Sequence, residues 1–173
     1  MLTKKQRDWL NHLSSENKIT IVPYDLKCHE IFSKIKIKIQ NSLGKNTKVE
    51  HMGASSLGIS GQDEIDVYVP VSPFKFNSYI LKMSKIFSKP RSLYPLERAR
   101  FKEEIDGKKI DLFLINEEHD DWINGVKFKN FLVSYPKELE KYKKLKENCN
   151  NLSVKEYYTR KIEFINEILK KCN

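Results

Sequence analysis

Hydrophobic residues follow a helical spacing over residues 26–44 and stop at Gly44, a residue that commonly ends helices. Within this window Ile35, Ile37 and Ile39 alternate, as they would in a strand. The longer apolar stripe around them recurs every three or four residues, which favours the helix. The pattern therefore predicts a helix with Ile35 and Ile39 on its buried side.

Several other segments have the spacing of strands. Residues 64–71 carry apolar side chains on both faces, which is typical of a strand inside a sheet. Two apolar segments flank Asp106-Gly107-Lys108, a strong signal for a hairpin turn. Strands are predicted at residues 18–25, 47–53, 64–71, 98–105 and 108–115.

The remaining periodic segments predict helices. Thr3 is suited to cap the first of them, and Ser153 with Glu156 predicts a capping box at the last. This order predicts an α+β fold: a small mixed β-sheet flanked by helices with a C-terminal helical part, in a single domain of residues 1–173. Helices are expected at residues 3–13, 26–44, 74–88, 120–133, from 136 onward and 153–171.

Length and composition exclude several classes of protein. The 173 residues suffice for one domain with a real core, and no run approaches the ~20 apolar residues of a membrane span. The N-terminus has no apolar signal-peptide centre, so we expect a soluble, cytoplasmic protein with no membrane partner. Cys28, Cys149 and Cys172 are too few and too scattered for a disulfide framework or a zinc site.

The net charge of +9 is compatible with a nucleic acid or a phosphorylated small molecule as partner. The positive charge is spread out, however. Residues 135–148 alternate Lys and Glu, which is typical of a solvated helix face. The charge alone therefore leaves open whether the basic residues form a solvated surface or bind a nucleic acid.

Two carboxylates stand at the start of the strand predicted at residues 64–71. Glu64 and Asp66 are two residues apart, so their side chains point to the same face of that strand. Like charges this close raise each other's pKa unless a cation lies between them. A third acid, Asp111, lies in the apolar strand after the hairpin and can lie beside them. Three such carboxylates are suited to Mg²⁺ in phosphoryl or nucleotidyl transfer.

The loop before these acids is rich in small residues. Gly53, Ser55 and Ser56 precede Glu64 by a stretch long enough to bring the loop back over the carboxylates. Small residues let phosphate oxygens approach backbone N–H groups, and hydroxyls add donors. The loop is therefore a candidate phosphate-binding site, with an ordinary turn as the alternative.

The order of these motifs resembles the nucleotidyltransferase superfamily with the polymerase-β-type core, and one branch, the GrpB-like family, matches more closely. Six stretches occur in that family's order and span nearly the whole chain: IVPYD (21–25), VEHMGASS (49–56), GQDEIDVYV (61–69), FKNFLVSYP (128–136), YKKLK (142–146) and YTRKIEFI (158–165). The resemblance implies a nucleotidyltransferase-like fold with a site near the GASS loop and the EID strand. It also places Lys146, Tyr158 and Lys161 at family positions.

The chain departs from the patterns it resembles at a few positions. Many GrpB-like proteins lack the first acid of the pair, so Glu64 makes this chain look more competent for metals. Ala54 replaces the serine of the superfamily's Gly-Ser, so a hydroxyl must come from the serines that follow. Gln62 and Asp63 stand where a related form has Lys and Gly, which removes a positive charge and adds a negative one.

Other basic residues are candidates for binding a nucleotide. Arg98, Arg100 and Lys102 alternate on one predicted strand and share a face, where they contact phosphates or form an exposed edge. Lys161 reaches the site or makes a helix–helix contact. Both alternatives stay open for each group.

The sequence thus suggests a Mg²⁺-dependent nucleotidyltransferase that moves a nucleoside monophosphate from a nucleoside triphosphate to a hydroxyl of an unidentified acceptor, whether a small molecule, a protein or RNA. Glu64, Asp66 and Asp111 would bind the metal and carry catalysis. The nucleotide would contact Gly53, Ser55, Ser56, Arg98, Arg100, Lys102 and Lys161. The alternatives are a nucleotide- or RNA-binding module that kept the fold and lost the reaction, and a phosphohydrolase using the same metals.

Overall fold

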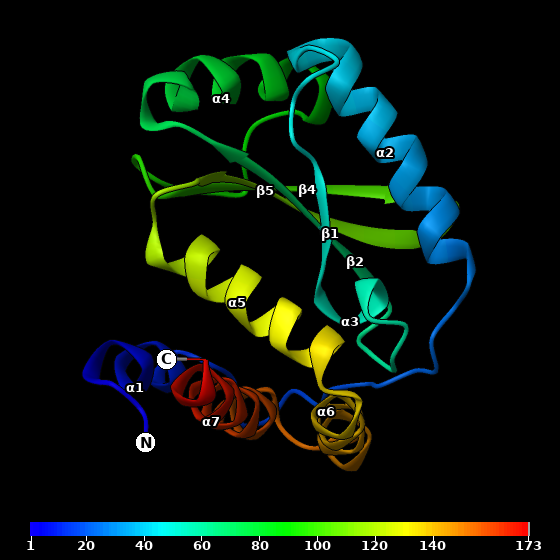
Figure 1. Ribbon diagram of the computed structural model, residues 1–173, viewed down its shortest axis with the longest axis vertical. Helices are drawn as coiled ribbons and strands as arrows, with labels where there is room; N and C mark the ends of the chain where they lie inside the picture. Colours follow the sequence, from blue (N-terminus) through cyan, green and yellow to red (C-terminus); the bar gives the residue numbers. More distant parts are fainter. Residues whose placement is uncertain (173) are drawn as a thin grey trace. The chain divides into compact units, whose positions relative to one another are not determined.

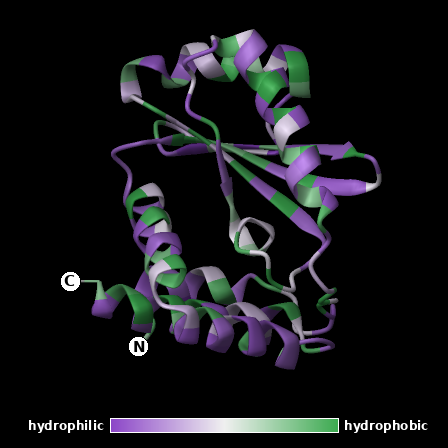
Figure 2. Cartoon of the chain, turned by 45° about the vertical axis from the view of Figure 1, so that its right-hand side comes forward, coloured by the Kyte–Doolittle hydropathy of each residue, from purple (hydrophilic) through white to green (hydrophobic). Residues whose placement is uncertain are grey.

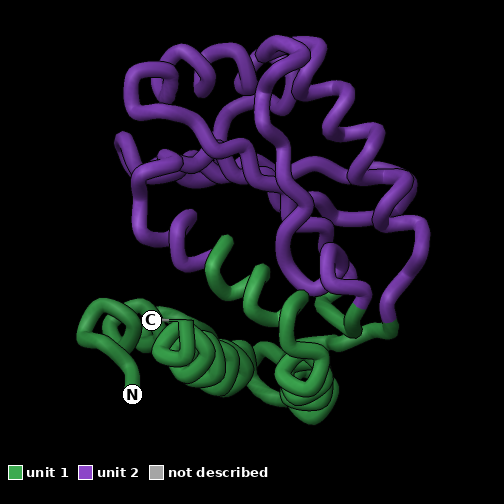
Figure 3. The backbone as a smooth tube through the Cα atoms, in the orientation of Figure 1, with its two compact units in different colours: residues 1–23, 59–62, 126–173 green, residues 24–58, 63–125 purple. Residues whose placement is uncertain are grey.

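The computed structural model describes residues 1–172 and divides the chain into two compact units (Figure 3). Unit 2 comprises residues 24–58 and 63–125, and unit 1 comprises residues 1–23, 59–62 and the described part of 126–173. Helix α5 (Asp120–Ser134) contributes to both units. The expectation of a single domain over residues 1–173 stays a prediction.

Unit 2 is built on a five-stranded sheet with the order β1-β2-β5-β4-β3 (Figure 1). The β2 and β5 strands run parallel, and the other neighbours are antiparallel. The predicted mixed sheet within an α+β fold is therefore confirmed. Its strands are β1 (Glu50–Met52), β2 (Glu64–Val71), β3 (Ser92–Tyr94), β4 (Arg98–Ile105) and β5 (Lys108–Asn116).

One face of this sheet is apolar and packs against helices α2 (Lys27–Leu43) and α4 (Pro73–Phe87). The alternation of each strand puts Val67 of β2 and Leu112 of β5 into this core, where both are fully buried. Hydrophobic and hydrophilic residues alternate along the two helices, whereas the turn end of the β4–β5 hairpin is hydrophilic (Figure 2). The apolar core that α2 and α4 cover thus occupies one side of the sheet. The other side carries the acids beside Tyr68, Phe113 and the buried Ile115.

The α2 helix settles the ambiguity in its sequence. Ile35 and Ile39 are fully buried, whereas Ile37 is 58% exposed, as a helix and not a strand requires. The predicted hairpin is also confirmed, because Asp106 (φ +51°) and Gly107 (φ +78°) form the two-residue turn between β4 and β5. Positive φ at both turn residues matches the twist of the flanking strands.

The sequence-based expectation was wrong for residues 18–25. They form no strand and make only isolated bridges, Lys18 to Ser153 and Val22 to Gly61. Pro23 has no N–H to donate, so a regular ladder cannot continue through it. The short strand β3 was not expected, because three residues are too few to show a period.

Unit 1 is helical. Thr3 caps the first helix, as predicted, through a capping box with Gln6. The Ser153 hydroxyl accepts a bond from Glu156 N, which is half of the predicted capping box, and the Glu156 carboxylate pairs with Arg160. Tyr157 and Cys149 are fully buried in its core. Besides its part of α5, the helices are α1 (Lys4–Asn11), α6 (Pro136–Asn148) and α7 (Val154–Lys171). Every helix among residues 1–172 is too short or too polar to span a membrane.

We predict that Ile35→Ala lowers the free energy of unfolding by about 2–5 kcal/mol, because it opens a cavity in a packed core. The matched control is Ile37→Ala on the exposed side of the same helix, which should change it by no more than about 0.5 kcal/mol. Urea denaturation followed by circular dichroism measures both. Equal losses in the two variants would contradict the burial of α2.

Candidate active site

The register of the parallel strands brings the three carboxylates together. Asp66 of β2 stands directly opposite Asp111 of β5, and Glu64 precedes Asp66 by two residues on the same face. Neighbouring strands lie about 4.8 Å apart, so the Asp66 and Asp111 side chains are close neighbours. The geometric condition for a shared site is met, because all three acids lie on the face opposite the apolar core.

The carboxylates of the site are partly or fully buried. Asp111 is buried, at 6% exposure, and Glu64 is half-buried. Burial raises the pKa of the Glu64 carboxyl above its ordinary 4.5, and the charges of Asp111 and Asp66 raise it further. Arg100 and Lys102 act in the opposite direction. Protons or cations are therefore favoured at this end of β2.

Arg100 of β4 is the close partner of Asp111. Its Nε donates to Asp111 Oδ1 at 3.1 Å, and its Nη2 donates to Oδ2. This two-pronged pair places the guanidinium on both oxygens of the carboxylate. Sequence reasoning placed Arg100 on the correct face but did not foresee this pairing.

The other two basic residues of β4 differ from Arg100. Lys102 stands opposite Asp111 in the ladder and is exposed. Arg98 makes an ion pair with Asp121 of α5, at 3.3 Å between Nη1 and Oδ2. Their assignment as nucleotide ligands stays a prediction, and Lys102 lies the nearer of the two to the acids.

Gly53 packs its backbone against the Asp66 carboxylate. A Cβ built on Gly53 would lie 2.8 Å from Asp66 Cγ and closer still to Oδ2, and its φ of +70° is one that glycine adopts freely. The short helix α3 (Gly53–Ser56) starts here. The loop can approach the acids this closely only because residue 53 has no side chain.

The two serines of the loop make hydrogen bonds within it. Ser55 Oγ is 2.9 Å from Nε2 of His51, which stacks on Phe32 with ring centroids 4.7 Å apart. Ser56 Oγ donates to Gly53 O at 2.8 Å. These bonds fix the shape of the loop, and the assignment of both hydroxyls to phosphates stays a prediction.

Asp63 does not add an uncompensated charge. It pairs with Lys108 at the start of β5, and Lys108 Nζ is also 3.0 Å from Asp25 Oδ2. The bond to Asp63, and to a lesser extent that to Asp25, raises the pKa of the Lys108 ammonium. Sequence reasoning missed Lys108, because a hairpin lysine carries no signal of partners so distant in the chain.

Lys161 lies on α7 in unit 1, where its Nζ is 5.3 Å from the ring centroid of Tyr158 and 5.9 Å from that of Tyr157. Lys146 of α6 is buried and donates to the Tyr157 hydroxyl at 2.8 Å, which joins α6 to α7. The Lys146 side chain therefore makes a helix–helix contact. The assignment of Lys161 to the nucleotide stays a prediction.

Comparison with known proteins agrees with the fold and the motifs. The family model described as GrpB protein matches residues 18–171. This chain belongs to the GrpB family. Solved structures with the same fold as this GrpB-family chain include the crystal structure of conserved protein GrpB from Enterococcus faecalis, with 21% identity, a TM-score of 0.70, and coverage of 88% of this chain and 96% of that chain. The family is nucleotidyltransferase-like, which confirms the resemblance seen in the sequence. A search of curated proteins found no match.

We predict that Gly53→Ala lowers the free energy of unfolding by about 3 kcal/mol or more, because strain at positive φ adds to a clash with Asp66. Gly107→Ala is the matched control, since it has positive φ and nothing within 4 Å of the new Cβ. It should cost only about 1–2 kcal/mol. Similar losses in both variants, measured by chemical denaturation, would argue against the close packing of Gly53 on Asp66.

We predict that Glu64→Gln stabilises the protein at pH 7. A folded-state pKa above 4.5 means that the native state binds the proton more tightly than the unfolded chain, so stability falls as pH rises from 4.5 through the folded pKa. The variant removes this loss, and its advantage should disappear below pH 4.5. Denaturation across pH 4–8 in metal-free buffer measures the difference, with exposed Glu104→Gln as control. An advantage independent of pH would contradict the raised pKa.

Proposed function

We propose that this GrpB-family chain is a Mg²⁺-dependent nucleotidyltransferase that moves a nucleoside monophosphate from a nucleoside triphosphate to an acceptor hydroxyl. The observation that carries the proposal is the placement of Glu64, Asp66 and Asp111 on one face of two parallel strands, with the Gly53 backbone beside Asp66. A nucleotidyltransferase-like fold adds to this support. Nucleotidyl transfer needs hard oxygen ligands and close access for phosphates at one point.

The donor set is suited to Mg²⁺. Three carboxylates supply hard oxygens, and their mutual repulsion, reflected in the raised pKa of Glu64, would be relieved by a divalent cation. Arg100 opposes this arrangement, because its guanidinium covers both oxygens of Asp111. Among residues 1–172 no set of three or more His, Cys, Asp or Glu side chains is already arranged as a metal site. A metal bound by all three acids would therefore compete with Arg100 for the Asp111 oxygens or share them with it.

Each part of the site would have a separate task in the reaction. Mg²⁺, when bound, would neutralise the triphosphate and lower the pKa of the acceptor hydroxyl. Glu64, Asp66 and Asp111 would hold it, and Asp111 would also take the hydroxyl proton. The acceptor oxygen would attack the α-phosphorus as the bond to the β-phosphate oxygen breaks, so that pyrophosphate leaves. Arg100 and Lys102 would face the departing phosphates.

A second candidate function is a nucleotide- or RNA-binding module that does not react. The Arg100–Asp111 pair favours it, since a guanidinium held on Asp111 would take the place of a metal. The hydrogen bonds that Ser55 and Ser56 make within their own loop also favour this candidate, because they occupy hydroxyls that would otherwise contact phosphates. This candidate predicts nucleotide binding that survives Asp111→Asn, without release of pyrophosphate.

We predict that one or more of the four nucleoside triphosphates raises the thermal unfolding temperature of the wild type only when Mg²⁺ is present. Asp66→Asn should abolish this shift and lower pyrophosphate release by ~100-fold or more, because the charge that holds the cation is lost. Asp8→Asn on the exposed side of α1 is the matched control and should behave as wild type. A shift without Mg²⁺ that survives Asp66→Asn and Asp111→Asn would favour the binding module. No shift with any nucleotide would overturn the nucleotidyltransferase and leave only an RNA-binding module, which a titration with RNA then tests.

We predict that Arg100→Gln destabilises the metal-free protein by about 1–3 kcal/mol, because it leaves the Asp111 carboxylate buried without its guanidinium. Mg²⁺ should then stabilise this variant more than it stabilises the wild type, since the guanidinium no longer competes for Asp111. Arg98→Gln is the matched control, as Arg98 pairs with Asp121 instead. An equal effect of Mg²⁺ on all three proteins would show that Arg100 and the metal do not compete.

A further inference from the structure

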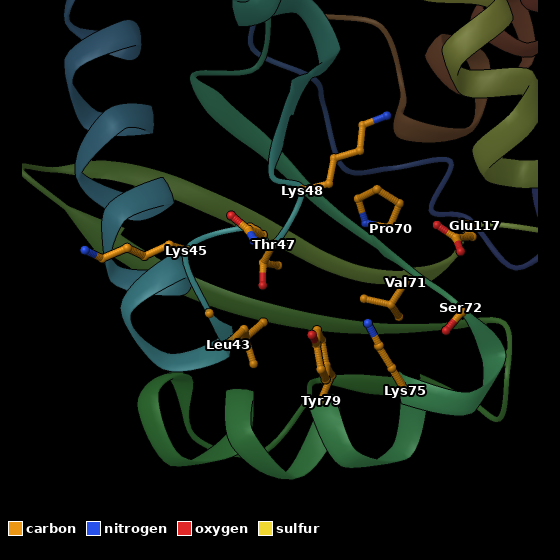
Figure 4. Close-up of a pocket in the computed structure, with 12 residues that line it drawn as sticks. Leu43, Lys45, Thr47, Lys48, Pro70, Val71, Ser72, Lys75, Tyr79 and Glu117 are labelled. Carbon is orange, nitrogen blue, oxygen red and sulfur yellow. The ribbon is translucent and has the colours of Figure 1, made fainter.

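A cavity lies at the opposite end of β2 from the carboxylates. It has a volume of about 380 Å³, within the usual range for small-molecule sites, and lies between the end of α2, the end of β2 and the first turns of α4 (Figure 4). Val71, the last residue of β2, lines it, whereas Glu64 is the first residue of that strand. At about 3.3 Å per residue the two sites are roughly 20 Å apart. The cavity is therefore separate from the candidate active site.

Hydrogen bonds to backbone carbonyl groups hold the walls of this cavity in place. The loop after α2 is fixed by Gly44 N donating to Gln40 O at 2.9 Å and by Gln40 Nε2 donating to Thr47 O at 3.0 Å. On the other side, Glu117 N donates to Val71 O at 3.0 Å and ties the ends of the parallel strands together. In open sheets, ligands commonly bind outside the carboxyl ends of such strands. The hydrogen bonds of both walls fix the shape of the cavity at this end of the sheet.

The lining combines an apolar floor with polar groups that converge on one side. Leu43, Pro70 and Val71 are buried and form the floor. Figure 4 shows Lys75 and Tyr79 rising together from α4, with the Thr47 hydroxyl directed toward Tyr79. Lys75 and Tyr79 are four residues apart on α4 and so share one face of that helix.

The positive charge directed at the cavity comes from Lys75, and Glu117, which also lines it, adds a negative charge. Figure 4 shows Lys45 and Lys48 pointing away, and the Lys48 ammonium is 3.6 Å from Glu50 Oε1 and 5.4 Å from the ring centroid of Trp122. Within the described chain, the Lys75 ammonium and the hydroxyls of Ser72 and Tyr79 have no hydrogen-bond or ion-pair partner. Donors without partners, gathered around an apolar floor, complement a small molecule that carries an oxyanion.

We infer that this cavity binds a small organic oxyanion. Lys75, Thr47 and Tyr79 donate to its phosphate or carboxylate group, and its apolar part lies on Leu43 and Val71. Phosphomonoesters and carboxylates share this chemistry. The inference does not depend on the proposed nucleotidyl transfer, because no residue of the cavity belongs to the candidate active site.

The test is a titration of the ¹⁵N-labelled full chain with phenyl phosphate, benzoate and inorganic phosphate, followed by amide chemical shifts. Benzyl alcohol serves as the neutral control. Shifts should concentrate at residues 43–48 and 71–79. Lys75→Gln should weaken binding at least tenfold, whereas Lys85→Gln, which removes the same charge from the exposed end of the same helix, should leave it unchanged. Tyr79→Phe provides a second variant that keeps the packing, and Asp66→Asn should bind the probes as wild type does.

The outcomes separate the two sources of oxyanion. Tighter binding of phenyl phosphate assigns a phosphate head group, and tighter binding of benzoate assigns a carboxylate. The inference is overturned if no probe shifts these residues, or if benzyl alcohol binds as well as the anions. It is also overturned if Lys75→Gln and Lys85→Gln weaken binding equally, because that result means nonspecific attraction to a basic helix.

Discussion

The parallel pairing of β2 with β5 fixes the chemistry of unit 2, because it sets Asp66 directly opposite Asp111. The same register puts Val67 beside Leu112 in the apolar core on the other face. A shift of one residue between the strands would exchange these faces and bury the acids among hydrocarbon. Packing of the core therefore holds the Asp66 and Asp111 carboxylates close together, and nearby cations must offset their repulsion.

The structure offsets this repulsion with cations from neighbouring strands. Arg100 covers Asp111, and Lys108 covers Asp63 just before the acidic strand begins. The Arg100 guanidinium donates to both oxygens of Asp111, so a metal bound at Asp111 would compete with it. This competition separates the two candidate functions, since a reacting enzyme would bind a metal at Asp111 beside Arg100 or in its place, and a binding module need not.

Much of the fold could be predicted because its signals are local. The alternation of residues 64–71, the turn at Asp106-Gly107 and the helical stripe through Ile35 each need only a few neighbouring positions. The shared face of the acids follows from the same periodicity. The strand predicted at residues 18–25 was wrong because no neighbouring segment pairs with them along their length, although their composition suits a strand.

The partners of the site residues could not be predicted, because they depend on contacts between distant segments. Arg100 contacts Asp111 only because of the register between β4 and β5. Lys108 pairs with Asp25, which lies far from it in the sequence. The sequence shows that such residues are charged, but not which charges neutralise one another. The loop serines are a similar case, since their hydrogen bonds to His51 and Gly53 appear only once the chain has turned.

The central claim is that Glu64, Asp66 and Asp111 share divalent cations. Its most direct test is a Mn²⁺ titration followed by electron paramagnetic resonance, in the presence of a non-hydrolysable nucleoside triphosphate analogue. The account predicts that the wild type removes Mn²⁺ from solution beyond what the nucleotide alone binds, and that Asp66→Asn does not. Equal binding of Mn²⁺ by the two proteins would contradict it.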